Sequence, residues 1–563
     1  MFSTVRHYTS TWLLPDLTAG IALTAFLVPT GMGYATASGL PVAHGLYASI
    51  AALVAYFVFG PSRILVLGPD SALAPLVAAA VAVGPAEEAP ARAALLAILA
   101  GLFCVAAAVL RLGILTDLVS KPVRIGYLNG IAITVIVGQL PTLVGMSPGD
   151  GVARGQSFAG DVLVVVDGLR HRDLDVVSLA IGGGCLAVIL LLRTLWPRVP
   201  GVLIAVLGAA AAVAGLQSGG LSTPEMVAEV PRGLPRLVLP GFDRDMIVAA
   251  IPVAAAIALV AAADTSVLSR AFPGPDAVPS PPNRELAALG IANLAAGLLQ
   301  GFPVSSSSTR TPIVAAAGGR TQLAGLVAAG GVAAVIAWAP GAVAMIPKTA
   351  LAAVVIAACA SLIDLAAMVT LARIRPWECG VSVVCLGGVV ALGVLPGILL
   401  AVAVALADFI WRSWRPHDAV LGRVEGVKGY HDIERHPEAL QVPGLVLFRW
   451  DSPLFVANAG MFRQRLLDVV AAAPTPTRRV IIAAEPMTDI DTTAADTLCQ
   501  LADELRARDI ELAFAELKGP VKDRLRRYGI YESFGSGAFE PTVGRAVAAY
   551  VKAHEVPWRD WSE

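Results

Sequence analysis

The sequence predicts a membrane protein of about fourteen transmembrane helices, arranged as two inverted repeats of seven spans and followed by a smaller α/β domain. Three observations support this prediction. Of the 563 residues, 56% are hydrophobic and only 15% are charged, and the mean hydropathy is +0.73, which is outside the range of soluble proteins. Apolar runs long enough to cross a bilayer recur before residue 418. Two short sequence segments also recur later in the chain, at nearly the same spacing.

The charged residues divide the chain near residue 418. Residues 1–418 hold 44 charged side chains, whereas the much shorter stretch 419–563 holds 39. We therefore expect a transmembrane domain over 1–418, with repeats at about 12–218 and 245–415, and a soluble domain over 419–563. A net charge of −1 argues against a nucleic-acid partner. Six scattered cysteines without a CxxC pair predict neither a metal site nor a disulfide framework.

The expected spans follow from the apolar runs in chain order. In the first repeat they are 17–37, 44–60, 92–110, 123–143, 177–195 and 199–217, with a run at 70–83 that is too short to cross alone. In the second they are 245–269, 285–300, 321–339, 342–360 and 377–411, the last being two spans broken at Pro396, with another short run at 307–317. The distribution of basic residues predicts both termini on the cytoplasmic side of the inner (plasma) membrane.

Two echoes indicate a duplication. The segment Pro75 to Ala80 recurs from Pro312 to Ala317, an offset of 237 residues. The segment that begins at Pro15 resembles the one that begins at Pro252, with an offset of 237 at the proline and 236 from Ile21 to Ile257. Because each copy holds an odd number of spans, the second copy must be inverted in the membrane.

Each short apolar run follows a segment that cannot be regular helix. The first contains Gly68 and Pro69, followed by Asp70 and Ser71, and the second is the serine-rich stretch 301–310. We expect two half-helices whose amino-terminal ends face each other near the midplane. Their unpaired N–H groups would form an anion site there. Alternatively, the serines only begin a polar helix or allow close packing.

Two ionisable residues fall within otherwise apolar spans. An arginine such as Arg310 costs about 2.5 to 3.5 kcal/mol at the bilayer centre, which indicates a cavity or a binding site. Asp264 could bind a proton or Na⁺, could pair permanently with Arg310, or could cap a helix. Burial disfavours the charged form of a carboxyl group, and this favours a coupling role for Asp264.

These motifs resemble the SulP family of sulfate permeases, the bacterial relatives of prestin and pendrin. The resemblance is carried by residues 29–41 and 44–49, by Gly68 and Pro69 with Ser71 and Ala72, and by residues 302–310. It implies a fold shared with uracil permeases, in which a core domain moves against a gate domain.

The resemblance also assigns roles by position. The anion-binding residues it implies are Thr30, Tyr34, Ser71, Ala72, Ser307, Ser308, Thr309 and Arg310. Asp264 falls where the family often has an acidic residue. Many relatives carry glutamine in place of Thr30, which leaves the preferred anion open. Leu268 stands where sodium-coupled relatives have a hydroxyl group, and this favours protons over Na⁺.

The soluble domain alternates strand-like and helical patterns. The expected strands are 444–450, 453–457, 479–484 and 510–515, and the expected helices are 460–472, 493–507, 519–528 and 541–552. It resembles the STAS domain of the same family. Asp491, Thr492 and Thr493 occupy the loop that is phosphorylated in related anti-sigma-factor antagonists. Alternatively, Asp491 or Thr492 only caps the following helix.

The resemblance implies a secondary active transporter that imports an oxyanion, sulfate first, together with protons. It also implies a homodimer in the lipid bilayer, and nothing in the sequence calls for a cofactor. The alternatives are a bicarbonate or dicarboxylate carrier, a passive anion channel, and a membrane-anchored signalling module. No paired carboxylates, metal cluster or nucleophile elbow points to an enzyme.

Overall fold

The computed structural model describes residues 8–113, 120–146, 158–171, 174–196, 199–227, 233–238, 244–272, 280–307, 309–535 and 537–559. The chain divides into two compact units, Met1–Ala405 and Leu406–Glu563, and the division falls inside the last membrane helix. Each unit is described by itself.

The first unit is helical because backbone polar groups in a bilayer must be paired within their own segment. Its first half contains η1 (Ser10–Trp12), α2 (Leu13–Ala37), α3 (Val42–Phe59), β1 (Leu67–Gly68), α4 (Ala74–Val81), η2 (Ala86–Glu88), α5 (Ala89–Val109), α6 (Lys121–Leu143), α7 (Phe158–His171), α8 (Val176–Leu195) and α9 (Gly201–Ser218). The second half contains α10 (Arg244–Ala271), α11 (Pro282–Leu298), β2 (Ser305–Ser306), α12 (Arg310–Ala316), α13 (Leu323–Trp338), α14 (Pro340–Ala344), α15 (Lys348–Ala360), α16 (Leu365–Ile374), α17 (Pro376–Leu392) and α18 (Val394–Trp414).

The predicted membrane-helical class is confirmed. Among the described residues, eight helices are long and apolar enough to cross a membrane. Three shorter apolar helices lie in α13, α17 and α18, and α11 and the half-helices α4 and α12 occupy the other predicted span positions. The last two spans separate at Gly393, where φ is +92°, and not at Pro396 as predicted. Proline is tolerated in the first turn of α18, where the missing N–H would have no partner, while Gly393 adopts a backbone conformation that suits glycine.

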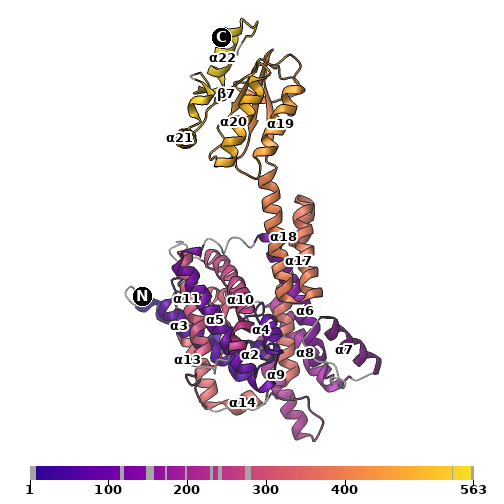
Figure 1. Cartoon of the computed structure of the whole chain (residues 1–563). Coiled ribbons are helices and arrows are strands. Elements are labelled where there is room, and N and C mark those ends of the chain that lie inside the picture. Colours follow the sequence, from indigo (N-terminus) through magenta and orange to yellow (C-terminus); the bar gives the residue numbers. More distant parts are fainter. Residues whose placement is uncertain are drawn as a thin grey trace. The chain divides into compact units, whose positions relative to one another are not determined.

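The membrane helices pack in two groups (Figure 1). The core group, which we define as α2, α3, α4, α5, α10, α11, α12 and α13, contains the packed pairs α11–α5, α13–α2 and α10–α5. The gate group, α6, α8, α9, α15 and α17, contains the pairs α17–α6, α15–α6 and α8–α9. The corresponding helices α2 and α10, α3 and α11, and α5 and α13, together with the half-helices α4 and α12, all fall in the core group, as a duplication requires.

Small residues let α2 and α3 approach closely, as in many membrane helix pairs. A Cβ atom added at Gly45 would lie 1.9 Å from the carbonyl oxygen of Gly31. The same addition at Gly31 would place a Cβ 3.2 Å from the Ser49 hydroxyl oxygen. The backbones are therefore in direct contact where the first two spans cross, close to Thr30.

We expect Gly45→Ala to lower the thermal unfolding temperature of the detergent-solubilised protein, because the methyl group must push the two helices apart. Overpacking of this kind costs about 1 to 3 kcal/mol or more. Gly183→Ala on α8 is the matched control, since a Cβ there meets no atom within 4 Å. If Gly45→Ala unfolds at the same temperature as wild type, helices α2 and α3 do not make the close backbone contact described here.

The second unit is a six-stranded sheet with helices on both faces. Its strands are β3 (Asp418–Arg423), β4 (Tyr430–Asp432), β5 (Leu445–Trp450), β6 (Arg479–Ala483), β7 (Glu511–Ala515) and β8 (Phe539–Glu540), in the order β4-β3-β5-β6-β7-β8. Its helices are α19 (Ala459–Ala471), α20 (Thr492–Arg506), α21 (Gly519–Arg527), α22 (Val543–His554) and the short η4 (Tyr531–Phe534). Strands β5 to β8 pair in parallel, and β3 pairs antiparallel to β4 and β5.

Successive side chains along β5 point to opposite faces of the sheet, and both faces are covered by helices. Val446, Phe448 and Trp450 pack with α19, α20 and α21, whereas Leu445 and Leu447 pack with α22. The expected helices and three of the four expected strands are present. The strand predicted at 453–457 is wrong, because only Leu454 forms a bridge there, to Ile490. Strands β3, β4 and β8 were not predicted.

Candidate functional site

Strands β1 and β2 place the two half-helices against each other. They pair antiparallel, with Leu67 opposite Ser306 and Gly68 opposite Ser305. Each strand leads into its half-helix, so antiparallel pairing sends α4 and α12 away from the crossing in opposite directions. Their amino-terminal ends therefore lie at the crossing, as the inverted repeat requires. The predicted broken helices are confirmed in this respect.

Asp70, a residue that the sequence did not single out for the site, stabilises the turn that leads into the amino-terminal end of α4. The backbone N–H of Ala72 donates to Asp70 Oδ2 at 3.1 Å, and the Asp70 carbonyl accepts from the N–H of Ala74 at 3.1 Å. A buried carboxylate thus occupies part of the positive end of this helix. Ser71 and Ala72 remain at the same end, both at least 95% buried.

Arg310 holds the crossing together. Its Nη2 atom donates to the carbonyl oxygens of Gly68 at 3.1 Å and Ser305 at 3.2 Å, and its Nη1 atom donates to Pro69. The guanidinium also forms an ion pair with Asp70, at 3.7 Å. Arg310 is 1% exposed. Its charge is therefore largely committed to the protein, and it does not pair with Asp264.

The other predicted anion-site residues surround this arrangement. Tyr34 is buried, and its hydroxyl has Asp70, Arg310 and Ser71 as polar neighbours. Thr30 is buried beside it on α2, but its hydroxyl donates to Phe26 in its own helix, at 2.7 Å. The hydroxyls of Ser307 and Thr309 lie 2.9 Å apart at the start of α12. Ser308 lies outside the described residues.

Two buried donors at the crossing have no hydrogen-bond partner among the described residues. They are Nε of Arg310 and the hydroxyl of Ser306. An unpaired buried donor costs about 1 to 3 kcal/mol, so such groups call for a ligand or water. Both can donate to an anion.

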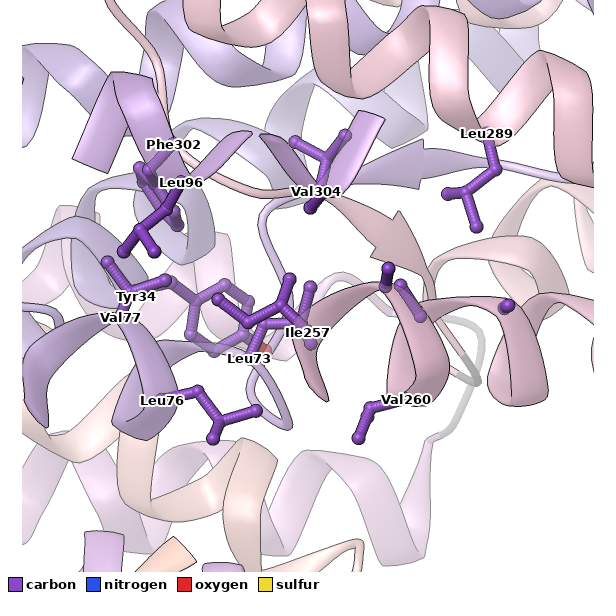
Figure 2. Packing of buried hydrophobic residues seen from close by; sticks show 14 of the residues in the cluster. Tyr34, Leu73, Leu76, Val77, Leu96, Ile257, Val260, Leu289, Phe302 and Val304 are labelled. Atoms are coloured by element: carbon purple, nitrogen blue, oxygen red, sulfur yellow. The ribbon is translucent and has the colours of Figure 1, made fainter. Parts of the chain in front are cut away.

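Apolar side chains enclose the crossing. Figure 2 shows Tyr34 in one buried cluster with Leu73 just before α4, Ile257 of α10 and Val304 before β2. A cavity of about 880 Å³ lies alongside, lined by residues of both helix groups that include Thr36, Pro75, Thr134, Gln139, Lys348 and Thr349. Pro75 lies in the first turn of α4, yet the candidate anion residues of the described chain do not line this cavity. The site is closed off from the cavity in this structure.

Asp264 lies in the carboxyl-terminal third of α10 and is 8% exposed. The hydroxyl of Tyr127 donates to Asp264 Oδ1 at 3.1 Å, and Nε of Arg124 lies 3.9 Å from the same oxygen. Asp70 is a further charged neighbour. The suggested pairing of Asp264 with Arg310 is therefore not seen. Sequence reasoning missed Arg124 and Tyr127, although a basic residue inside the span 123–143 was a signal.

In the second unit, Asp491 is the N-cap residue of α20. Its Oδ1 accepts the N–H of Ala494 and its Oδ2 accepts the N–H of Val456, both at 2.8 Å. Thr492 and Thr493 follow in the first turn, and both are exposed. Asp491 therefore caps α20, as one of the two sequence interpretations expected. The hydroxyl groups of Thr492 and Thr493 are exposed and so are accessible for modification.

Asp491→Ala should release both N–H groups, at a cost of about 1 to 2 kcal/mol of local stability. We expect faster amide hydrogen exchange in the first turn of α20 and in the loop around Val456, measured by mass spectrometry on the full-length protein. Asp496→Ala, an exposed position on the same helix, is the control. Equal exchange rates in the two variants would show that the cap contributes nothing.

Known proteins resemble the chain over nearly its whole length. The family model for the sulfate permease family matches residues 13–385, and the STAS domain model matches residues 436–546. A Mycobacterium tuberculosis protein named a probable sulfate transporter is 40% identical over 97% of this chain and 96% of its own length. The chloroplastic sulfate transporter 4.1 of Arabidopsis thaliana is 30% identical over 97% of this chain and 81% of its own.

A solved structure shares the fold. The murine solute carrier 26 family member A9 anion transporter, in an inward-facing state, superimposes with a TM-score of 0.88 at 20% identity, and the match covers 98% of this chain and 93% of the other. At this identity the likeness concerns the fold alone.

Proposed function

The chain belongs to the sulfate permease family, and from that premise we propose that it is a secondary active transporter that imports sulfate together with protons. Its membership makes it an anion transporter of the membrane and not an enzyme. The observation that carries the finer proposal is the antiparallel β1–β2 crossing, which brings the amino-terminal ends of two inverted half-helices to one buried place.

The anion binds at this crossing, between α4 and α12. The ends of both helices, the unpaired donors of Arg310 and Ser306, and the hydroxyls of Ser71 and Ser307 supply positive potential and hydrogen bonds. Ala72, Thr309 and Tyr34 shape the same pocket, with Thr30 behind them. Asp70 balances the charge of Arg310, so the empty site is close to neutral and a bound dianion brings its own charge.

Alternating access follows from the two helix groups. The crossing belongs entirely to the core group, whereas the cavity lies between the core and gate groups. Movement of one group against the other would open the crossing to the cavity on one side and then to the opposite side. Sulfate is proposed first because one of the relatives described above is named a probable sulfate transporter and the other a sulfate transporter.

Asp264 carries the coupling proton. Moving one charge inward against a negative-inside potential costs about 2.3 kcal/mol per 100 mV, so a dianion entering alone would be opposed strongly. Protons that enter with it offset this cost. Asp264 is a buried carboxyl group near the crossing, and Leu268 in place of a hydroxyl favours protons over Na⁺.

We place the transporter in the inner (plasma) membrane as a homodimer, with both termini and the STAS domain in the cytoplasm. The exposed Thr492 and Thr493 beside Asp491 make the start of α20 the proposed regulatory loop of that domain.

Counterflow in proteoliposomes tests the substrate. Vesicles are loaded with unlabelled sulfate, diluted into labelled sulfate, and challenged with unlabelled bicarbonate, dicarboxylates or chloride. We expect sulfate to compete best and an inward proton gradient to drive accumulation. If bicarbonate or a dicarboxylate competes more strongly than sulfate, that anion and not sulfate is the substrate. Conductance without accumulation would indicate a channel. The absence of any flux would favour a signalling module.

A further inference from the structure

Two side chains of α6 reach from the gate group to the proposed proton carrier in the core group. Tyr127 donates its hydroxyl to Asp264 Oδ1 at 3.1 Å, and Arg124 Nε lies 3.9 Å from the same oxygen. Residues three positions apart on a helix share one face, so Arg124 and Tyr127 approach Asp264 together. Helices α6 and α10 belong to different groups, and these interactions therefore bridge the surface along which the groups must move.

The environments of the two donors differ. Tyr127 is 1% exposed, so its hydroxyl depends on Asp264 for a partner. The Arg124 side chain is 34% exposed, so one side of it remains open to its surroundings. The same carboxylate oxygen thus receives a buried hydrogen bond and the attraction of a partly exposed cation.

The charges that act on Asp264 come from two directions. Arg124 and Tyr127 face it from α6, and Asp70 faces it from the segment between β1 and α4. Helices α4, α5 and α11 and strand β2 also pack on α10, and no charged group from their described residues acts on Asp264. Asp70 is in turn paired with Arg310. With Asp264 ionised the four charges balance, and protonation leaves one positive charge in excess.

We propose that Arg124 and Tyr127 are positioning residues for proton coupling, which hold the ionised Asp264 against α6 and release α10 when Asp264 is protonated. The inference rests on the proposed function, because it takes Asp264 as the proton carrier. A hydrogen bond to a carboxylate is about twice as strong as one to a neutral group, and an ion pair disappears when the carboxylate is neutralised. Loading of the proton therefore loosens the contact between the two helix groups.

The first test is the pH profile of labelled sulfate uptake into proteoliposomes at fixed membrane potential. Arg124→Gln removes the cation that favours the ionised carboxylate, so the pH of half-maximal uptake should rise by about one unit. Tyr127→Phe should shift the profile in the same direction by a smaller amount. Arg124→Lys, which keeps the charge, should restore most of the wild-type profile.

Lys121→Gln is the matched control, because Lys121 is an exposed cation one turn earlier on α6. Its profile should equal that of wild type. In an Asp264→Asn background, Arg124→Gln should add no further change. The inference is overturned if the profiles of Arg124→Gln and Tyr127→Phe coincide with wild type, or if Arg124→Gln still shifts the profile of Asp264→Asn.

A second test does not depend on sulfate transport. Amide hydrogen exchange of α6 is measured at acidic and alkaline pH, with correction for the intrinsic rate. We expect faster exchange at acidic pH in wild type and equally fast exchange at both in Asp264→Asn. Exchange of α6 that does not respond to pH would reject the inference. Wild-type protein that shows this response but no proton-driven sulfate uptake would reject only the proposed function.

Discussion

Asp264→Asn is expected to abolish the accumulation of sulfate that a proton gradient drives. Asparagine has nearly the same shape as a protonated aspartate, but it can neither release nor take up a proton. The binding site at the β1–β2 crossing lies on other residues, so exchange of sulfate across the membrane should continue. The measurement compares uptake of labelled sulfate under an inward proton gradient with counterflow at equal pH on both sides. The accumulation ratio should fall to that of passive equilibration, while counterflow persists.

The matched control is Asp245→Asn, in the exposed first turn of the same helix. It should leave both measurements unchanged. Retained accumulation in Asp264→Asn would remove Asp264 from the coupling mechanism. Loss of counterflow as well as accumulation would instead assign Asp264 a role in binding or folding.

Substitution of Arg310 should have the second large effect, on folding and on transport. Arg310→Ala leaves the buried carboxylate of Asp70 without its cation and removes the donors to three carbonyl oxygens. Removal of one partner from a buried ion pair costs about 3 to 5 kcal/mol. We expect a clear drop in the thermal unfolding temperature and no measurable sulfate flux.

Arg310→Lys separates charge from geometry. Lysine keeps the positive charge, but its ammonium group cannot reproduce the planar guanidinium that reaches Gly68, Pro69 and Ser305 at once. Folded protein with sulfate uptake lowered by about tenfold or more is the expected result. Arg320→Lys, at an exposed position beyond α12, is the control. Normal uptake by Arg310→Lys would mean that only the charge matters.

Local sequence signals were sufficient to predict that the two half-helices meet at the β1–β2 crossing, but they did not predict which side chains pair there. The Gly-Pro break at Gly68, the serine run before Arg310 and the nearly equal offsets of the two echoes predicted facing half-helices. The same reasoning expected Arg310 to face the anion. Its pairing with Asp70 depends on the register of β1 against β2, which joins residues more than 200 positions apart.

In the second unit, too, local sequence patterns predicted some elements correctly and failed where long-range packing decides the structure. Alternation of apolar residues predicted β5, β6 and β7, whose two faces are both covered by helices. It wrongly predicted a strand at 453–457, because only Leu454 of this segment packs in the core, from an isolated bridge to Ile490, while Val456 is exposed. Asp491 could be recognised as a helix cap, since capping is a local interaction between a side chain and N–H groups a few residues away.

The sequence by itself determined the membrane class, the two broken helices, the inverted duplication and the presence of a buried acid at Asp264. Each of these follows from hydrophobic length, local backbone breaks or internal similarity, which are properties of contiguous segments. Only the tertiary structure decided that Asp70 neutralises Arg310 and that Arg124 and Tyr127 reach Asp264. These contacts join helices far apart in the chain, and in a bilayer their choice depends on the packing of small side chains, which leaves little trace in an alanine-rich sequence.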